Sequence, residues 1–188
     1  MTIRPYGLQC EHRSCPLGIG SARPLLSWKL AAHSPALHQG AYRVQVVSLA
    51  SGDGPGRVVW DTSWQEGATV HGLVYAGEPL QSAMKYEWSV QVRDQRGQEG
   101  RAVGSWFETG LLLADDWQAA WIGRARLARS ANPPEGRWQS RATAYLAPPC
   151  QLRKEFQLDA TAPLRRARLY VSAKGIYRAR LNGQRAGY

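Results

Sequence analysis

Apolar and polar side chains alternate strictly between residues 85 and 93. Tyr86, Trp88, Val90 and Val92 occupy every second position, and polar or charged residues fill the positions between them. Successive side chains of an extended strand point to opposite faces, so this pattern buries one face of a sheet and leaves the other in water. A helix would spread the four apolar side chains around its circumference, because its period is 3.6 residues. The pattern therefore predicts an antiparallel sheet with one solvated face.

The same alternation recurs in shorter segments along the first 110 residues. These segments are residues 26–30, 42–46, 58–60 and 105–109. Nineteen glycines and eleven prolines interrupt the chain too often for long helices. We therefore predict an all-β chain that begins with an antiparallel sandwich over residues 1–110. Its core is expected to hold Trp28, Trp60, Trp88 and Trp106.

The spacing of Leu80 and Tyr86 resembles the tyrosine corner of immunoglobulin-like and fibronectin type III domains. In that motif a tyrosine near the start of the penultimate strand ties down the chain that crosses between the sheets. Residues 1–110 are therefore similar to a fibronectin type III module. A likeness of this kind concerns the fold and says little about function.

The second part of the chain is divided into three predicted segments. Residues 111–123 form a connector, in which Asp115 or Asp116 is expected to cap a short helical turn with Trp117 and Trp121 on one side. Residues 124–150 are expected to form an irregular basic loop. Residues 151–188 are predicted to start a second β-domain.

Alternation returns within residues 152–158, 164–173 and 177–182, and Asn182-Gly183 is typical of a two-residue hairpin turn. An isolated hairpin is marginally stable in water. Residues 151–188 are therefore expected to open a β-domain that the chain does not close.

Positive charge is concentrated at the C-terminal end. Residues 1–123 hold 10 basic and 11 acidic side chains, whereas residues 124–188 hold 14 basic and 3 acidic ones. Such asymmetry suggests nucleic-acid or membrane binding. The arginines follow strand alternation and do not form a block, which favours an exposed strand face with an acidic protein partner outside the chain. Nucleic acid is an unlikely partner on this reading, and no membrane partner is expected.

Cysteine usage and the N-terminal residues predict a cytoplasmic protein. The three cysteines, Cys10, Cys15 and Cys150, are too few and too irregular for a disulfide framework. The first residues contain no apolar run that would serve as a signal core, and no segment reaches the length of a membrane span. A secreted parent protein that has lost its leader is the alternative.

The sequence gives little support for a metal site or a catalytic pair. Cys10, His12 and Cys15 offer three metal ligands without a fourth at regular spacing, so no metal is expected. Glu155 and Asp159 share a strand face but lie about 13 Å apart in extended chain. We therefore predict no catalytic residue and no cofactor.

Four aromatic residues lie among the arginines of the C-terminal third and are candidates for stacking on sugar rings. They are Trp138, Tyr145, Tyr170 and Tyr177. The alternative is that they pack against neighbouring strands.

The order of these segments resembles the N-terminal region of bacterial α-L-rhamnosidases. The likeness is carried by residues 17–28, 41–44, 59–61, 75–82, 86–88, 106–110, 116–123, 152–156, 166–171 and 180–183. It implies a multi-domain glycoside hydrolase in which a fibronectin-like module precedes a jelly-roll domain and an (α/α)₆ barrel. It also implies hydrolysis of terminal α-L-rhamnosyl groups with inversion, by two carboxylates of the barrel. No residue of this chain matches a catalytic position of that family.

Three hypotheses follow for function. The first is the non-catalytic N-terminal part of an α-L-rhamnosidase-like hydrolase, which supports and orients the domains that follow it. On this hypothesis the chain is inactive alone and its partners are those domains. Rhamnosides are a further candidate ligand. The second is a free-standing carbohydrate- or protein-binding sandwich. The third is a basic nucleic-acid-binding protein.

Overall fold

The computed structural model describes residues 3–49, 56–123, 150–158, 164 and 166–187. The chain divides into two compact units, one of Met1–Trp117 with Tyr170–Tyr188 and one of Gln118–Leu169. All the strands of the described residues lie in the first unit. Those residues include one short 3₁₀ helix, and none of their helices is long and apolar enough to cross a bilayer.

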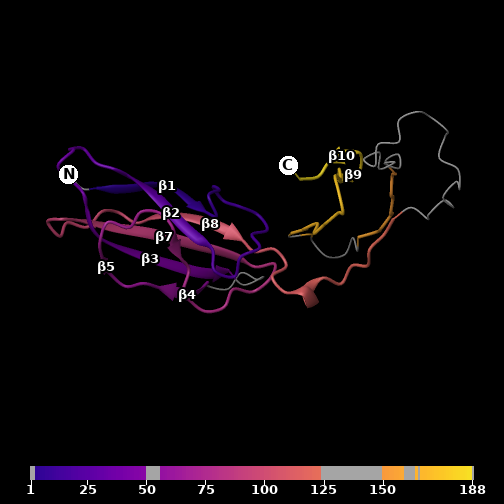
Figure 1. Ribbon diagram of the computed structural model, residues 1–188, viewed down its shortest axis with the longest axis horizontal. Helices are drawn as coiled ribbons and strands as arrows, with labels where there is room; N and C mark the ends of the chain where they lie inside the picture. The colour runs from indigo at the N-terminus through magenta and orange to yellow at the C-terminus, as the bar shows by residue number, and fades with distance from the viewer. Residues whose placement is uncertain (1–2, 50–55, 124–149, 159–163, 165, 188) are drawn as a thin grey trace, which may run out of the picture. The chain divides into compact units, whose positions relative to one another are not determined.

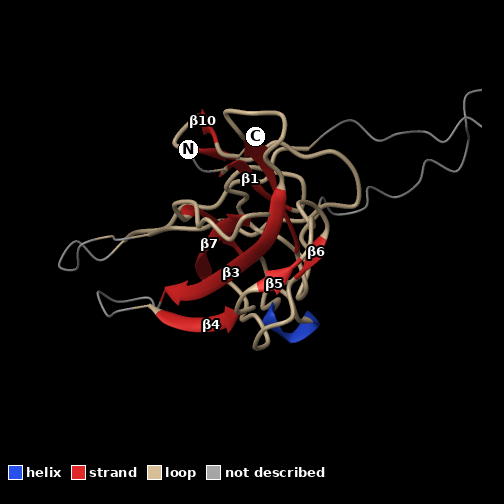
Figure 2. Ribbon diagram, turned by 90° about the vertical axis from the view of Figure 1, so that its left-hand side faces the viewer, coloured by secondary structure: helices blue, strands red, loops and turns tan. Residues whose placement is uncertain are grey.

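Two antiparallel sheets form a sandwich (Figure 1). The larger sheet has the order β4-β3-β7-β8, with β5 added beside β3, and the smaller has the order β1-β2-β6. The strands of the larger sheet are β3 (Gln39–Leu49), β4 (Arg57–Asp61), β5 (Gln65–Glu66), β7 (Lys85–Asp94) and β8 (Val103–Glu108). Those of the smaller sheet are β1 (Arg4–Cys10), β2 (Leu25–Ala31) and β6 (Leu73–Val74). Figure 2 shows β4 and β5 beside β3, and both pair with the edge of β3 that faces away from β7.

Cross-strand register places the apolar positions of the larger sheet on one inner face. Val44 lies opposite Val90, and Val46 lies opposite Trp88. All four side chains are almost inaccessible to solvent, and Leu26 and Trp28 of β2 join them in one core. The predicted all-β sandwich is therefore confirmed.

A buried amide lies inside this core. Gln39 is 3% exposed, and its Oε1 accepts a hydrogen bond from Nε1 of Trp28 at 3.2 Å. Its Nε2 donates to the carbonyl oxygens of Gly67 and Thr69 at 3.0 and 2.8 Å. Because a buried amide costs free energy unless it is hydrogen-bonded, these contacts allow Gln39 to link β2 and β3 with the chain after β5.

The four predicted core tryptophans do not all lie in the core. Trp28 and Trp88 are buried, and Trp60 packs against the core from its edge. Trp106 is half-exposed, because it lies opposite the exposed Glu87 on the outer face, whereas the neighbouring Phe107 is fully buried. The prediction that Trp106 lies in the core was wrong, because the neighbouring Phe107 occupies the inward-facing position of this strand.

The tyrosine corner is present. The backbone N–H of Gln81 donates to the Tyr86 hydroxyl at 2.8 Å, one residue after the predicted Leu80. The Tyr86 ring stacks on Phe107 with centroids 5.3 Å apart. Burial raises the pKa of Tyr86, so the hydroxyl stays neutral. This contact fixes the crossing segment before β7, as the sequence predicted.

The connector contains a single turn of 3₁₀ helix, η1 (Ala114–Asp116). The Asp116 carboxylate caps it by accepting from the backbone N–H of Leu113 at 2.9 Å, and it also accepts from the Ser82 hydroxyl. The Ser82 hydrogen bond, followed by the Leu113 one, lowers the pKa of Asp116. The predicted cap is confirmed, but the helix ends before Trp117 and does not extend to Trp121.

Among the described residues of the C-terminal segment, a short hairpin is the one regular element. β9 (Arg180–Leu181) pairs with β10 (Gln184–Arg185) around Asn182 and Gly183, whose φ angles are +49° and +81°. These positive angles confirm the predicted turn. The longer strands predicted at 152–158 and 164–173 are not formed in the described residues, because no neighbouring strand accepts their backbone hydrogen bonds there. Residues 124–149 of the region predicted as a basic loop, 124–150, lie outside the described residues.

Candidate functional site

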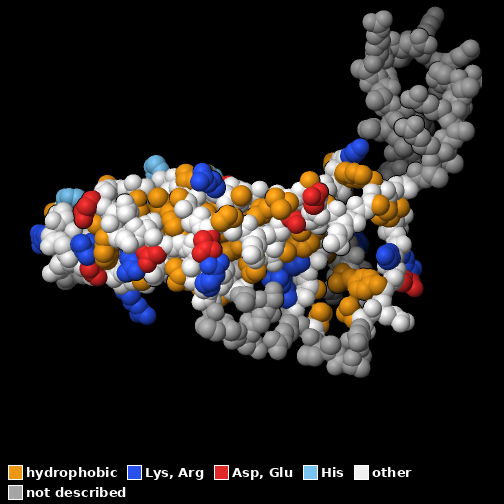
Figure 3. All heavy atoms as spheres, turned by 90° about the horizontal axis from the view of Figure 1, so that it is seen from below, with side chains coloured by type: hydrophobic (Ala, Val, Ile, Leu, Met, Phe, Trp, Pro, Cys, Tyr) orange, Lys and Arg blue, Asp and Glu red, His pale blue; other side chains and the backbone are white. Residues whose placement is uncertain are grey.

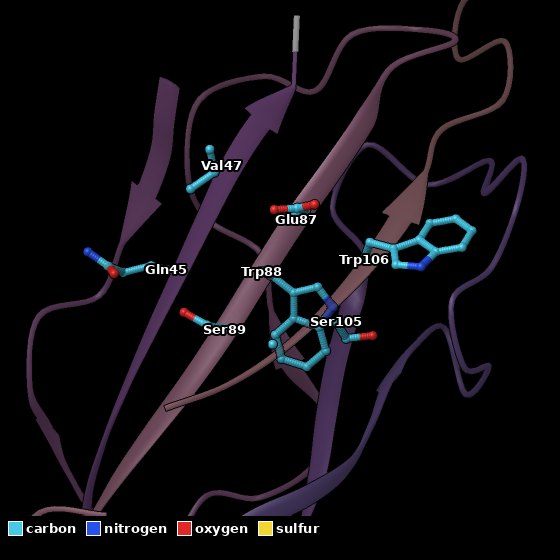
Figure 4. Close-up of a pocket in the computed structure, with 8 residues that line it drawn as sticks. Gln45, Val47, Glu87, Trp88, Ser89, Ser105 and Trp106 are labelled. Atoms are coloured by element: carbon cyan, nitrogen blue, oxygen red, sulfur yellow. The ribbon is translucent and has the colours of Figure 1, made fainter. Parts of the chain in front are cut away.

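The outer face of the larger sheet carries a hollow of about 370 Å³ (Figure 4). β3, β7 and β8 each contribute to it, and the lining residues are Gln45, Val47, Glu87, Trp88, Ser89, Gly104, Ser105 and Trp106. Strand alternation divides this lining into residues whose side chains face outward and residues whose side chains face the core. The side chains of Trp88 and Ser105 belong to the inner face, so their backbone forms part of the floor.

A cation holds the indole of Trp106 at the edge of this hollow. Nζ of Lys85 lies 4.9 Å from the centroid of the Trp106 ring. An ammonium group at this distance is attracted by the negative face of the indole. The contact favours one orientation of a large aromatic side chain that the core does not cover.

Hydrogen bonds order the polar wall of the hollow at β3. Nε2 of Gln45 donates to Oδ2 of Asp61 at 2.8 Å. The guanidinium of Arg43 donates to both oxygens of the same carboxylate, at 3.0 and 2.5 Å. Oδ1 of Asp61 also accepts from the backbone N–H of Ser63 at 2.8 Å. Asp61 is therefore the organising group of this wall, and the Arg43 hydrogen bonds hold its pKa well below the usual range.

Replacing Asp61 with asparagine is expected to lower the free energy of unfolding by about 1 kcal/mol near neutral pH, since Arg43 is partly exposed and water screens the pair. The pKa of Asp61 is lower in the folded state, so its stabilisation is complete above the unfolded pKa and is lost as pH falls below about 4. Urea unfolding of both proteins across this range measures the difference.

The matched control for that prediction is the same substitution in an Arg43→Met background. There the dependence on pH should be much weaker, because the ionic partner is absent. An equal difference in stability at acidic and neutral pH in the Arg43 protein would contradict the assignment.

Charged side chains of opposite sign lie next to one another on the face of the sandwich in Figure 3. Arg57 donates to Glu78 through two hydrogen bonds of 2.6 Å, and Arg93 pairs with Glu99 at 2.7 Å. The hydrogen bonds from Arg57 lower the pKa of Glu78. These carboxylates act as partners of arginines within the described sandwich.

The candidate metal ligands do not converge. Cys10 is buried at the end of β1, and burial raises the pKa of its thiol to about 12. Sγ of Cys15 lies 3.7 Å from Oγ of Ser105, and His12 is exposed. Within the part of the chain that the structure describes, no group of three or more His, Cys, Asp or Glu side chains is placed to hold a metal ion.

Two of the four aromatic residues predicted to contact sugar, Trp138 and Tyr145, lie outside the described residues. Tyr177 is 53% exposed. Tyr170 is half-buried, and its hydroxyl has no hydrogen-bond partner among the described residues. The role of these four residues stays a prediction.

Sequence reasoning missed the hollow beside Trp106. Trp106 and Phe107 are adjacent and both apolar, so either phase of this strand would supply one aromatic side chain to the core. The available signal was Val103, which lies on the same strand face as Phe107, whereas Gly104 lies on the same face as Trp106. The apolar Val103 would have indicated that the Phe107 face is the buried one.

Comparison with known proteins identifies long relatives of this chain. An α-L-rhamnosidase of Streptomyces avermitilis is 33% identical over 190 residues, which include 96% of this chain. An α-L-rhamnosidase of Alteromonas sp. (strain LOR) is 33% identical over 175 residues. The chain spans 18% of the length of each of these relatives.

The fold has a counterpart among solved structures. The crystal structure of Streptomyces avermitilis α-L-rhamnosidase complexed with L-rhamnose matches 65% of this chain with a TM-score of 0.59 and 36% identity. The match covers 12% of that enzyme. The predicted likeness to the N-terminal region of α-L-rhamnosidases is confirmed. Residues 5–113 match the family described as the Rha78A-like, N-terminal immunoglobulin domain, and the chain belongs to this family.

Proposed function

We propose that this chain is the non-catalytic N-terminal part of an α-L-rhamnosidase-like glycoside hydrolase, in which it supports and orients the domains that carry the chemistry. The observation that carries the proposal is the match of nearly the whole chain to 18% of an α-L-rhamnosidase, through a family of N-terminal immunoglobulin domains. A domain of this kind contributes a rigid sandwich to a larger protein.

The electrostatics of the described carboxylates support this proposal. An inverting glycosidase needs two carboxyl groups about 6.5–9.5 Å apart, and its general acid needs a raised pKa. Asp61, Glu78 and Asp116 instead have lowered pKa values, because each accepts hydrogen bonds from neighbouring donors. Each of them is therefore an anion held by its neighbours, which suits a structural role.

The other domains of such an enzyme are the proposed partners. The C-terminal segment presents exposed apolar side chains, and these include Leu152, Phe156, Leu158, Leu169, Val171 and Ile176. Covering such side chains with a neighbouring sheet is favourable, because it removes apolar surface from water. The excess of arginine in residues 124–188 would be matched by acidic groups on the same partner.

A chimera tests the proposed role. The matching N-terminal region of the Streptomyces avermitilis enzyme is deleted in one protein and replaced by this chain in another. Deletion is expected to lower the melting temperature and the soluble yield of the enzyme, because its remaining domains lose a packed neighbour. The chimera is expected to recover much of both, together with hydrolysis of an aryl α-L-rhamnoside.

Two controls make this experiment decisive. A chimera that carries Trp88→Ala should fail to recover, since its sandwich is weakened, and an unrelated immunoglobulin-like domain in the same position should not substitute. A chimera that behaves like the deletion, with the inserted chain folded, would contradict the supporting role.

A further inference from the structure

The hollow beside Trp106 combines an aromatic ring with several neutral or mixed polar groups. Trp106 is half-exposed on β8, and Glu87 and Ser89 of β7 lie on the same face of the sheet. Gln45 and Val47 of β3 complete the wall on the far side of β7 (Figure 4). An indole offers an apolar surface for C–H groups, while amide, hydroxyl and carboxylate groups bind hydroxyls. This pairing of surfaces suits a ligand with one apolar face and a hydroxylated edge.

A glycine keeps the hollow open. Gly104 lies in the middle of β8, where glycine weakens a strand and often marks a close approach of a ligand or another backbone. A Cβ added to it would meet only the carbonyl oxygen of Trp88, at 3.6 Å, which is ordinary contact. By comparison, a Cβ at Gly40 or Gly100 would come within 2.9 or 2.3 Å of backbone oxygen.

Packing therefore accounts for Gly40 and Gly100 but not for Gly104. The φ angle of Gly104 also lies outside the positive range that requires glycine. Its visible effect is on the outer face, where any side chain at this position would fill the space next to Trp106 and Ser89. The lack of a side chain at Gly104 thus leaves this space open.

The charges around the hollow favour an uncharged ligand. Glu87 is the acidic group of its lining, and the ammonium of Lys85 stands over the Trp106 ring at its edge. Asp61, which is the partner of Gln45 and not itself part of the lining, is already bound by Arg43 and Gln45. Because the charges of Glu87 and Lys85 have opposite signs, neither an anion nor a cation gains a net advantage. The volume of about 370 Å³ lies at the small end of ligand sites.

We propose that this hollow binds a neutral pyranose, with the sugar ring against the Trp106 indole over Gly104 and its hydroxyls on Gln45, Glu87 and Ser89. A pyranose presents an apolar C–H face and a hydroxylated rim, as the lining requires. The site lies entirely on the sandwich, and the proposal for it is argued from the geometry of the sandwich. It is therefore independent of the proposed role in a hydrolase.

Nuclear magnetic resonance on the ¹⁵N-labelled full-length chain tests this site. The chain is titrated with methyl α-L-rhamnopyranoside and methyl α-D-mannopyranoside, and with glycerol as a hydroxylated probe that lacks a ring. At least one pyranoside is expected to cause saturable shifts of the Gly104 amide and the Trp106 indole N–H, with a Kd on the order of 1 mM. Glycerol is expected to cause none.

Three variants separate the hollow from the rest of the surface. Gly104→Val fills the space in a position that accepts a Cβ, and it should weaken binding at least about tenfold while the thermal stability is kept or raised. Trp106→Ala should weaken binding similarly. Trp117→Ala removes an exposed indole from the connector and should leave binding unchanged.

Several outcomes would overturn the proposal. These are the lack of saturable shifts with both pyranosides, equal shifts with glycerol, or undiminished binding by Gly104→Val. Saturable shifts confined to residues away from the hollow would also contradict it.

Discussion

Replacing Trp88 with alanine is expected to lower the free energy of unfolding of the sandwich by about 4 kcal/mol, the range for removing a large aromatic side chain from a packed core. Trp88 is 2% exposed and lies in the central strand β7, opposite Val46 on one side and Ser105 on the other. No polar contact compensates, since its indole N–H has no partner among the described residues. Urea unfolding followed by far-ultraviolet circular dichroism measures the change.

Trp106→Ala is the matched control for this substitution. Both tryptophans lie on adjacent strands, but Trp106 is half-exposed on the outer face and contacts Lys85. Its removal is expected to cost about 1 kcal/mol, from a cation–π contact and partial burial. Equal losses for the two variants would show that the assignment of inner and outer faces is wrong.

Thr109→Val is expected to lower the free energy of unfolding by about 3 kcal/mol, although valine has nearly the same shape as threonine. Thr109 is completely buried just after β8. Its Oγ1 accepts from the backbone N–H of Met84 at 3.0 Å and donates to the carbonyl oxygen of Gln81 at 2.6 Å. Valine would leave both backbone groups without this partner in the bend that leads into β7. Thermal and urea unfolding measure the loss.

The control is Thr109→Ser, which keeps the hydroxyl and removes a methyl group. Its expected cost is about 1 kcal/mol, the value for one buried methyl group. Serine should therefore be better tolerated than the isosteric valine. The reverse order would show that packing, and not the hydrogen bonds to Met84 and Gln81, fixes this bend.

The alternating segments of the first 110 residues were sufficient to predict the sandwich. Strand period and turn residues determine which side chains share a face, and the strand around Trp88 has only one phase that buries its apolar residues. The tyrosine corner was predictable for a similar reason, because its spacing along the chain is local. Trp106 was not, since two adjacent aromatic residues make the phase of a short edge strand ambiguous.

Features that depend on distant partners were harder to predict. The hollow requires the register of three strands, and the Asp61 network joins residues of β3 and β4 that are 16 and 18 positions apart. Alternation at 152–158 predicted a strand, but a strand forms only beside another that accepts its backbone hydrogen bonds. Local pattern therefore overestimated the structure of the C-terminal segment.

The most direct test of this account is an assay of the purified 188-residue chain for release of L-rhamnose from an aryl α-L-rhamnoside, with the Streptomyces avermitilis enzyme as the positive control. The chain belongs to a family of N-terminal immunoglobulin domains, and the described carboxylates with shifted pKa values are held as anions by their neighbours. We expect a folded β-sandwich that releases L-rhamnose no faster than the uncatalysed reaction does. Release that is proportional to the concentration of the chain, and is lost when the sandwich is unfolded, would contradict it.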